Sequence, residues 1–386
     1  MKFVFLSNYF NHHQKSFCEH LYKKLGQDFV FIATTVMREE RRKLGYGEND
    51  FPEYVLLSYL NRENEELADR YIAEADIVVV GSAPEAMLKS RKKAGKIILR
   101  YSERLLKNGF EPWKYPIRFQ RWHKNNPKGL PIYMLCASAY TSADYAKFGL
   151  FKGKTYKWGY FPECKKYDDL TGLISNKEKN RIMWCGRFLD WKHPDDALVV
   201  ARKLKEQKYD FHMDIIGTGE MEDSLKQYVE IHELKDVVSL LDPMKPEKIR
   251  EKMEKAGIYL FTSDKKEGWG AVLNEAMNSA CAVVASHAIG SVPYLLKNHE
   301  NGLIYESGNT DMLYGCVKYL LDNPEEQIRL DIAAYHTITA EWNAEVAAER
   351  FVNLAEHILM EEKDIDLYAS GPCSKAETIK DNWFKE

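Results

Sequence analysis

Glu267 and Glu275, separated by seven residues, are the two side chains whose spacing says most about chemistry. They stand in the segment KKEGWGAVLNEAMNSA, residues 265–280. A strand is predicted to end near Ser263 and a helix to begin near Gly270. Glu267 would then lie in the loop and Glu275 about a turn and a half into the helix. The two carboxylates would contact different parts of one elongated ligand.

Two glycines follow Glu267 and favour a ligand rich in hydroxyl groups. Gly268 and Gly270 leave the neighbouring backbone N–H groups able to donate hydrogen bonds, which a sugar ring would accept. A carboxylate inside a helix that packs on a sheet is costly to bury without a partner. Ribose hydroxyls would be suitable partners for Glu275.

A pair of cations, Arg187 and Lys192, lies in the segment WCGRFLDWKHPDDALVVARKL, residues 184–204. The pair follows a predicted strand directly and precedes a helix with apolar residues at helical spacing. The guanidinium fork of arginine and the point charge of lysine together suit the stabilisation of a diphosphate leaving group. The alternative, two solvated surface cations, remains open on this stretch alone.

The turn IIGTGE, residues 215–220, is a candidate for a phosphate or a ribose. In open parallel sheets, ligands bind at the carboxyl ends of the strands, where helix N-termini present N–H groups. Gly217 and Gly219 would let such a ligand approach the backbone closely. The third glycine of the dinucleotide fingerprint is missing, so a plain strand-to-helix turn explains the pattern equally well.

Strands and helices alternate in both halves of the chain, and they must position these side chains. Five strands are predicted in the first half, at 2–6, 29–34, 76–81, 96–101 and 132–137. Five more are predicted in the second half, at 181–186, 212–217, 237–242, 258–263 and 281–286. The predicted fold class is therefore α/β, with two Rossmann-like domains.

We expect an N-terminal domain at 1–165 and a C-terminal domain at 175–362, joined by a polar linker within 159–180. A long helix at about 342–362 would close the second domain. A Gly-Pro break follows, and a final helix at about 366–386 is a candidate to pack back on the N-terminal domain.

Composition excludes several classes of protein. A chain of 386 residues with 45% hydrophobic and 29% charged residues is typical of a two-domain globular protein. The net charge of -3 gives no global attraction to nucleic acid, which is not an expected partner. Seven cysteines without a CxxC pair predict free thiols in a reducing compartment. No signal-peptide core or membrane-spanning apolar run is evident, so we expect a cytoplasmic protein.

Four elements in order carry a resemblance to a known family: GRFLDWK, IIGTGE, EGWGAVLNE and ASHAIGSVP followed by NGLIY. Together they resemble the nucleotide-sugar domain of retaining glycosyltransferases of family 4 over roughly residues 180–355. The resemblance implies a GT-B fold, in which two Rossmann-like domains face a central cleft. It also implies a nucleotide diphosphate sugar as donor, for which we prefer a UDP-linked sugar, and no metal or other cofactor.

The resemblance assigns roles residue by residue. Arg187 and Lys192 would hold the donor diphosphate, beside Gly186 and Gly217. The donor sugar would contact Glu267 and the amides of Gly268, Trp269 and Gly270. Glu275 would bind the ribose, and the base would lie near residues 240–244. Catalysis would rest on Glu267, Arg187 and Lys192.

Two departures from the family pattern stand out. Tyr294, in IGSVPYLL, replaces an acid that many relatives carry. Many relatives also have a histidine in the N-terminal domain that reaches the donor sugar, whereas this chain reads ILRYSERLLKNG there. Ser102, Glu103 or Arg104 would fill that role, with Glu103 preferred, or the position is vacant.

The acceptor is expected on the first domain. Asn11, His12 and His13 follow the first predicted strand, although a histidine pair in a loop is often only a hydrogen-bonded surface feature. Residues 89–128 hold thirteen lysines and arginines against two acids, with aromatic residues interleaved. Such a region suits an anionic membrane surface that carries a lipid-linked saccharide. A solvated basic face, or one that binds a soluble anionic acceptor, is the alternative.

These features predict a metal-independent retaining glycosyltransferase. It would transfer a hexose from a nucleotide diphosphate sugar to a saccharide or lipid-linked acceptor during glycan or surface polysaccharide synthesis, in the cytoplasm or at the inner face of the membrane. Two alternatives stay open. One is a nucleotide-sugar epimerase or hydrolase of the same fold, and the other is a non-catalytic partner subunit. The sequence leaves the sugar, the base, the linkage and the oligomeric state undetermined.

Overall fold

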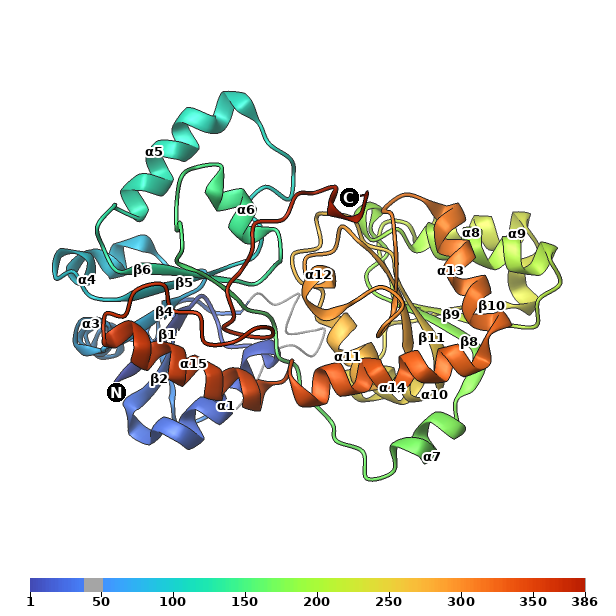
Figure 1. Cartoon of the computed structure of the whole chain (residues 1–386), viewed down its shortest axis with the longest axis horizontal. Helices are drawn as coiled ribbons and strands as arrows, with labels where there is room; N and C mark the ends of the chain where they lie inside the picture. The colour runs from blue at the N-terminus through green and yellow to red at the C-terminus, as the bar shows by residue number, and fades with distance from the viewer. Residues whose placement is uncertain (38–50, 386) are drawn as a thin grey trace. The chain divides into compact units, whose positions relative to one another are not determined.

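The computed structural model describes residues 1–37 and 51–385. The chain divides into two compact units (Figure 1). The first unit comprises Met1–Glu163 and Asn343–Lys380, and the second comprises Cys164–Trp342 and Asp381–Glu386. Each unit is built on one sheet of parallel strands, which confirms the predicted α/β class.

Sheet A, in the first unit, has seven strands in the order β3-β2-β1-β4-β5-β6-β7. The strands are β1 (Phe3–Ser7), β2 (Phe29–Ala33), β3 (Val55–Leu57), β4 (Ile77–Val80), β5 (Ile98–Ser102), β6 (Ile132–Cys136) and β7 (Thr155–Lys157). The sequence pattern predicted five of them and missed β3 and β7. These two are edge strands of three residues each, too short to show a period.

The helices of the first unit connect successive strands of sheet A, except the last, which comes from the distant C-terminal part of the chain. They are α1 (His12–Leu25), α3 (Arg62–Glu74), α4 (Lys89–Lys93), α5 (Tyr115–Asn125), α6 (Thr141–Ala146) and α15 (Ala344–Leu359). Helix α1 begins directly after β1, where the Asn11 side chain caps it by accepting a hydrogen bond from the His13 N–H.

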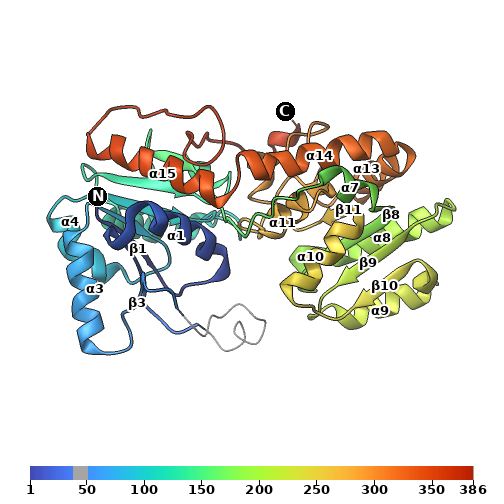
Figure 2. The same ribbon diagram turned by 90° about the horizontal axis from the view of Figure 1, so that it is seen from below.

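The position of α15 corrects the expected domain boundary. We expected residues 342–362 to close the C-terminal domain, but α15 belongs to the first unit and lies beside α1 (Figure 2). The cause is an aromatic cluster: the buried Phe351 ring lies 4.9 Å from the Phe3 ring, 5.9 Å from Phe17 and 5.4 Å from Trp158. Burial of several aromatic rings outweighs proximity along the chain.

The segment after α15 corrects the expected final helix at 366–386. It does pack on the first unit, but as extended chain against β7. The Lys157 N–H donates to the Ser374 carbonyl, and the N–H groups of Cys373 and Ala376 donate to Lys157 and Thr155. Extended pairing satisfies the backbone groups along the edge of β7, which a helix packed there would leave to water. The last residues, from Asp381 on, belong to the second unit.

Sheet B, in the second unit, has six strands in the order β10-β9-β8-β11-β12-β13. The strands are β8 (Glu178–Cys185), β9 (His212–Ile216), β10 (Val238–Leu241), β11 (Ala256–Phe261), β12 (Ala282–Ser286) and β13 (Leu303–Tyr305). All residues of β11 and β12 are buried, as expected of central parallel strands covered by helices. The five predicted strands are present, and only the short β13 was missed.

The helices of the second unit lie between the strands of sheet B or after β13 in the sequence, except α7, which precedes β8. They are α7 (Leu170–Ser175), α8 (Pro194–Glu206), α9 (Glu222–Ile231), α10 (Pro246–Lys255), α11 (Val272–Asn278), α12 (Val292–Leu295), α13 (Thr310–Asp322) and α14 (Pro324–Ala340). Within the described ranges, no helix combines the length and the apolar character that crossing a membrane requires.

Candidate functional site

Sheet B contains a topological switch point between β8 and β11. From β8 the chain proceeds through β9 and β10 to one edge, and from β11 it proceeds through β12 and β13 to the other. The loops that follow β8 and β11 therefore begin at the point of the carboxyl edge where the strand order reverses, which is the usual ligand position in open parallel sheets. Lys192 lies in the first loop, and Glu267 lies in the second.

Lys192 and Glu267 meet across this switch point. The distance between Lys192 Nζ and Glu267 Oε2 is 2.5 Å, and both side chains are largely buried. The Ser263 hydroxyl also donates to Glu267 Oε2, at 3.0 Å. The structure thus joins two residues that the sequence pattern had placed in separate parts of a ligand site.

Thr262 fixes the backbone of the Lys192 loop against the end of β11. Its hydroxyl donates to the Lys192 carbonyl at 2.7 Å and accepts from the indole N–H of Trp184 at 2.8 Å. A backbone bond adds to this, because the Asp264 N–H donates to the Trp191 carbonyl at 2.9 Å. Thr262 gave no signal in the sequence, where it is an ordinary residue at a strand end.

Glu275 lies in the first turn of α11, since the helix begins at Val272, two residues later than expected. Its carboxyl group is half-buried, and desolvation raises its pKa to about 7. Among the described residues no group donates a hydrogen bond to it. A half-buried carboxyl group without a donor is unfavourable by itself and is suited to a ligand that brings hydroxyl groups.

The Trp269 side chain anchors this loop and leaves only the backbone of the residue for a ligand. Its side chain is completely buried, and the indole N–H donates to Asn274 Oδ1 at 2.9 Å. The ring packs 6.2 Å from Tyr294 and 5.8 Å from Trp342. Tyr294, which stands where many relatives carry an acid, stacks on Trp342 at 5.7 Å and 15°. In place of an acid, Tyr294 therefore adds an aromatic ring that packs with Trp269, a residue of the Glu267 loop, and with Trp342.

The glycines of the IIGTGE turn serve close packing between loops. A Cβ atom on Gly217 would lie 1.9 Å from the Gly186 carbonyl oxygen, and one on Gly219 would lie 2.5 Å from the Phe188 carbonyl oxygen. The Phe188 N–H donates to the Thr218 carbonyl at 2.9 Å. Close packing between the loops is therefore sufficient to explain these glycines. Gly217 and Gly186 still line the carboxyl edge, where the ends of β8 and β9 meet.

Arg187 is exposed on the loop after β8, in contrast to Lys192.

Residues 240–244, the expected base region, lie at the end of β10, on the far side of β9. The Gly217 N–H donates to the Leu241 carbonyl at 2.9 Å. Gly268 and Gly270 accompany Glu267, and Gly270 has φ +83° with the Phe261 ring too close for any Cβ atom. The loops after β8, β9 and β11 thus place Arg187, Gly217 and Glu267 at one edge of sheet B.

A family model described as "Glycosyl transferases group 1" matches residues 170–337. These residues form a glycosyl transferases group 1 domain. The match covers the loops after β8, β9 and β11, with Lys192, Glu267 and Glu275, and does not extend into the first unit.

Two curated relatives that match this chain are named as glycosyltransferases. The amylovoran biosynthesis glycosyltransferase AmsK of Erwinia amylovora is 27% identical over 183 residues, which cover 46% of this chain and 45% of that protein. An uncharacterized glycosyltransferase of Haemophilus influenzae is 26% identical over 157 residues, 41% of this chain and 44% of its own length. These matches thus span somewhat less than half the length of either curated relative.

Among solved structures, Anabaena Alr3699/HepE in complex with UDP has a TM-score of 0.67 at 14% identity and covers 92% of this chain and 100% of its own. The same protein is also known with UDP-glucose, at a TM-score of 0.61. Likeness at this identity shows a shared fold, and the expected GT-B fold is thereby confirmed.

A group of possible metal ligands lies at the start of α8 in the group 1 domain. Ligand atoms of His193, Asp195 and Asp196 lie within 4.8 Å of one another. Asp195 and Asp196 also occupy the first turn of α8, where carboxylates stabilise the positive end of the helix dipole. His193 interacts with Asp264 at 3.8 Å, which raises the pKa of the imidazole. Interaction with the helix dipole explains the two carboxylates without an ion.

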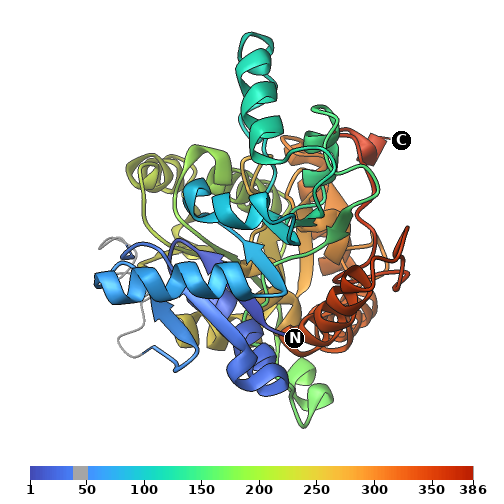
Figure 3. The ribbon, with the colours of Figure 1, turned by 90° about the vertical axis from the view of Figure 1, so that its left-hand side faces the viewer.

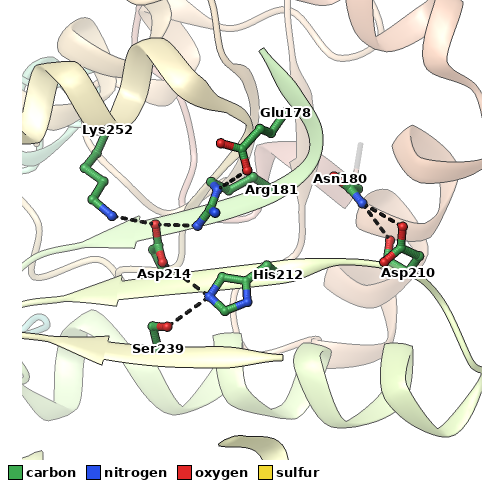
Figure 4. A network of polar contacts seen from close by, with 8 residues as sticks. All are labelled: Glu178, Asn180, Arg181, Asp210, His212, Asp214, Ser239 and Lys252. Atoms are coloured by element: carbon green, nitrogen blue, oxygen red, sulfur yellow. Dashed lines mark hydrogen bonds and ion pairs between the residues drawn. The ribbon is translucent and has the colours of Figure 1, made fainter. Parts of the chain in front are cut away.

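A second polar network of the group 1 domain surrounds the buried Asp214 of β9 (Figure 4). Asp214 Oδ2 lies 3.0 Å from Arg181 Nη1 and 3.2 Å from Lys252 Nζ, and Oδ1 lies 3.6 Å from His212 Nε2. Arg181 pairs in turn with Glu178 at 2.7 Å. These contacts tie α10 to two strands. They satisfy a buried carboxylate inside the sheet and make no contact with Lys192 or Glu267.

In the first unit, Tyr160, which the sequence did not single out, contacts two of the predicted residues, His13 and Glu103. The His13 ring stacks on Tyr160 at 5.4 Å and 14°. The Tyr160 hydroxyl donates to Glu103 Oε1 at 2.5 Å. His12 lies beside His13, with ring centroids 3.7 Å apart. Because β1 and β5 both end here, Tyr160 joins His13 and Glu103 into one cluster at the carboxyl edge of sheet A.

Two first-unit candidates have structural roles. The Asn11 side chain caps α1, as described above. Arg104, one of three residues considered for the missing histidine, is buried under the Tyr140 ring and paired with Asp144 at 3.4 Å. Desolvation raises the pKa of Asp144 despite this partner. A guanidinium held in this way is not available to a ligand. Of the three, Glu103 and the half-buried Ser102 lie nearer the surface.

Proposed function

We propose that this protein is a retaining glycosyltransferase that moves a hexose from a UDP-sugar to a saccharide or lipid-linked saccharide acceptor. The observation that carries the proposal is the Lys192–Glu267 ion pair at the switch point of a group 1 domain. The likeness to a protein known with UDP and with UDP-glucose supports the choice of donor.

Each residue of the edge has a task in this proposal. Lys192 and Arg187 neutralise the diphosphate, whose charge grows as the bond to the sugar breaks. Glu267 and the amides of residues 268–270 hold the sugar hydroxyls. Glu275 accepts hydrogen bonds from the ribose. Because the charge on the leaving group is met by side-chain cations and helix N-termini, the reaction requires no metal ion.

The acceptor is assigned to the carboxyl edge of sheet A. His13, Tyr160 and Glu103 form a hydrogen-bonded and stacked cluster there, and their mixture of aromatic and carboxylate groups suits a saccharide. Glu103 is the candidate for the role that a histidine fills in many relatives.

Thermal unfolding with UDP, GDP, ADP or TDP and their sugar conjugates tests the donor assignment. A ligand at a hundred times its Kd adds about 2.7 kcal/mol to the free energy of unfolding, which raises the Tm by roughly 5–10 °C. We expect UDP to raise the Tm of the wild type, and the effect to shrink in Glu275→Ala and Arg187→Ala. Glu251→Ala, on the exposed face of α10, is the matched control and should keep the full shift.

Two results would count against the proposal. No shift with any nucleotide would favour the non-catalytic partner subunit. Release or rearrangement of the sugar from the donor alone, followed by nuclear magnetic resonance, would favour the hydrolase or epimerase.

A further inference from the structure

Helix α5 and the turn before it expose several large apolar side chains on the surface of the first unit. In Figure 3, α5 is the teal helix that stands out from the rest of its unit. Of the twelve large apolar side chains that are exposed among the described residues, four lie within residues 110–119. They are Phe110, Trp113, Ile117 and Phe119, exposed by 46%, 72%, 70% and 39%.

The inner face of α5 already has its packing partners. The Tyr115 ring stacks on Phe148 at 5.2 Å and 13°, and Trp122 packs edge-on against Tyr145 at 5.3 Å. The His123 ring is bonded to the Phe148 carbonyl at 2.9 Å. Since these contacts anchor the helix, the exposed apolar residues are not needed to hold it in place.

The outer face combines apolar and cationic side chains at helical spacing. Trp113, Ile117, Arg121 and Lys124 follow one another at intervals of four, four and three, which places them on one stripe. Lys128 lies just beyond the helix, and all five are exposed. Within the described ranges, Arg121, Lys124 and Lys128 have no carboxylate partner. We call these five residues the α5 surface.

The structure shows which cations of the basic region expected at 89–128 are available to a partner. Several of its cations are bound internally. Arg91 is buried and donates to four backbone carbonyls, and Arg104 is paired with Asp144. Arg100 and Lys92 both pair with Glu85. Among the described residues of this region, the exposed cations without a carboxylate partner are Arg121, Lys124 and Lys128 at α5 and Lys89 and Lys93 on α4. Only those at α5 lie beside exposed apolar side chains.

We propose that the α5 surface docks on an anionic lipid bilayer. Basic side chains are attracted to acidic headgroups, and a tryptophan with an adjacent isoleucine is suited to the interface between headgroups and acyl chains. A soluble polyanion would use the cations and leave Trp113 and Ile117 in water. A bilayer satisfies both kinds of side chain, and for this reason it is the preferred occupant.

The inference specifies where a lipid-linked acceptor would approach, and in that respect it rests on the proposed function. The loop from Glu103 leads directly from the carboxyl edge of sheet A to Trp113 and α5. A bilayer at α5 would thus present its headgroups near the edge that carries Glu103.

Flotation of the full chain with lipid vesicles tests docking without any substrate. Vesicles of phosphatidylcholine are compared with vesicles that also contain phosphatidylglycerol, at low and at high salt. We expect the wild type to float with the anionic vesicles only, and high salt to reduce the bound fraction. Arg121→Gln/Lys124→Gln should lower the partition coefficient about thirtyfold, at roughly fivefold for each cation.

Apolar insertion has its own variant and control. Trp113→Ser/Ile117→Ser keeps the charge and should lower partitioning roughly tenfold or more. The control for the cation variant is Lys23→Gln/Lys24→Gln, at the exposed end of α1, which removes the same charge elsewhere. The control for the apolar variant is Ile231→Ser, on α9, which removes an exposed apolar side chain elsewhere. Both controls should float like the wild type.

The outcomes separate this inference from the proposed function. Absence of the wild type from the floated fraction with anionic vesicles would overturn docking, even where UDP still raises the Tm. Equal losses in the α5 variants and in the controls would overturn the assignment to this surface. A lower floated fraction in Arg121→Gln/Lys124→Gln without any effect of Trp113→Ser/Ile117→Ser would show binding by charge alone, as to any polyanion, and would contradict the proposed docking of the apolar side chains. Flotation that depends on α5 supports it whether or not UDP binds.

Discussion

Lys192 Nζ and Glu267 Oε2 lie 2.5 Å apart, although they come from loops 75 residues apart in the chain. In the proposed function Lys192 neutralises a diphosphate and Glu267 holds a sugar, and the structure joins these two side chains in one contact. Because a diphosphate carries more negative charge than one carboxylate, a bound donor would compete with Glu267 for Lys192. Glu267 would thereby become available to the sugar hydroxyls when the donor binds.

This competition predicts opposite effects of two substitutions on UDP affinity. Lys192→Gln removes a charge-assisted bond to the diphosphate and should weaken UDP binding by about 1.5–3 kcal/mol. Glu267→Gln removes the competitor, so UDP should bind as well as or better than to the wild type. Its rate of sugar transfer should nevertheless fall about 100-fold or more. Isothermal titration with UDP and a steady-state transfer assay measure the two quantities. Equal loss of UDP affinity in both variants would refute this division of roles.

The raised pKa of Glu275 predicts that the free energy of unfolding depends on pH. Desolvation raises its pKa from the usual value to about 7, so the folded chain retains a proton that the unfolded chain has released. The contribution of Glu275 to the free energy of unfolding therefore falls as pH rises from about 4.5 to about 7. Glu275→Gln should gain stability relative to the wild type over this interval, by up to about 3 kcal/mol.

Urea denaturation at pH 5 and pH 8 measures that difference. Glu251→Gln, an exposed glutamate of the same unit, should show the same stability change at both pH values. A stability difference between Glu275→Gln and the wild type that does not change with pH would show that Glu275 is ionised throughout the range.

Thr262 is predicted to act through Lys192. Thr262→Val keeps the shape of the side chain but removes the bonds to the Lys192 carbonyl and the Trp184 indole. UDP affinity should fall several-fold, at about 0.5–1.5 kcal/mol. In a Lys192→Gln background the same change should have little further effect on UDP binding, because the residue it positions is gone. Additive losses in this double-mutant cycle would mean that Thr262 has only a general structural role.

Asp214 is predicted to support stability and to leave donor binding unchanged. Asp214→Asn would leave Arg181 and Lys252 without their buried carboxylate, at a cost of about 3 kcal/mol in the free energy of unfolding. Glu178→Gln removes a half-exposed partner of Arg181 and should cost less than about 1 kcal/mol. Both variants should bind UDP with the affinity of the wild type. A selective loss of UDP binding in Asp214→Asn would connect this network to the donor site.

The cluster of His193, Asp195 and Asp196 makes the proposed metal independence testable. Transfer measured in excess EDTA, and again after addition of magnesium or manganese, should proceed at one rate. Loss of activity in EDTA that a divalent cation restores would contradict the proposal. The variant Asp196→Asn would then identify whether this cluster holds the ion.

The sequence by itself determined the α/β class, the ten longer strands and the group of residues at the carboxyl edge of sheet B. These features are local in origin. Apolar runs of strand length alternate with helical periods, and a residue that directly follows a parallel strand must lie at the carboxyl edge. Arg187, Lys192, Gly217 and Glu267 could be placed in this way without knowledge of which strands are neighbours.

Only the tertiary structure decided which of those residues meet, because strand order and ring packing join segments that are distant in sequence. The adjacency of β8 and β11 pairs Lys192 with Glu267, and the packing of Phe351 on Phe3 transfers α15 to the first unit. The same holds for charge. A count of basic residues cannot distinguish Arg91, which is buried among backbone carbonyls, from Arg121, which is exposed, since burial depends on contacts with residues far along the chain.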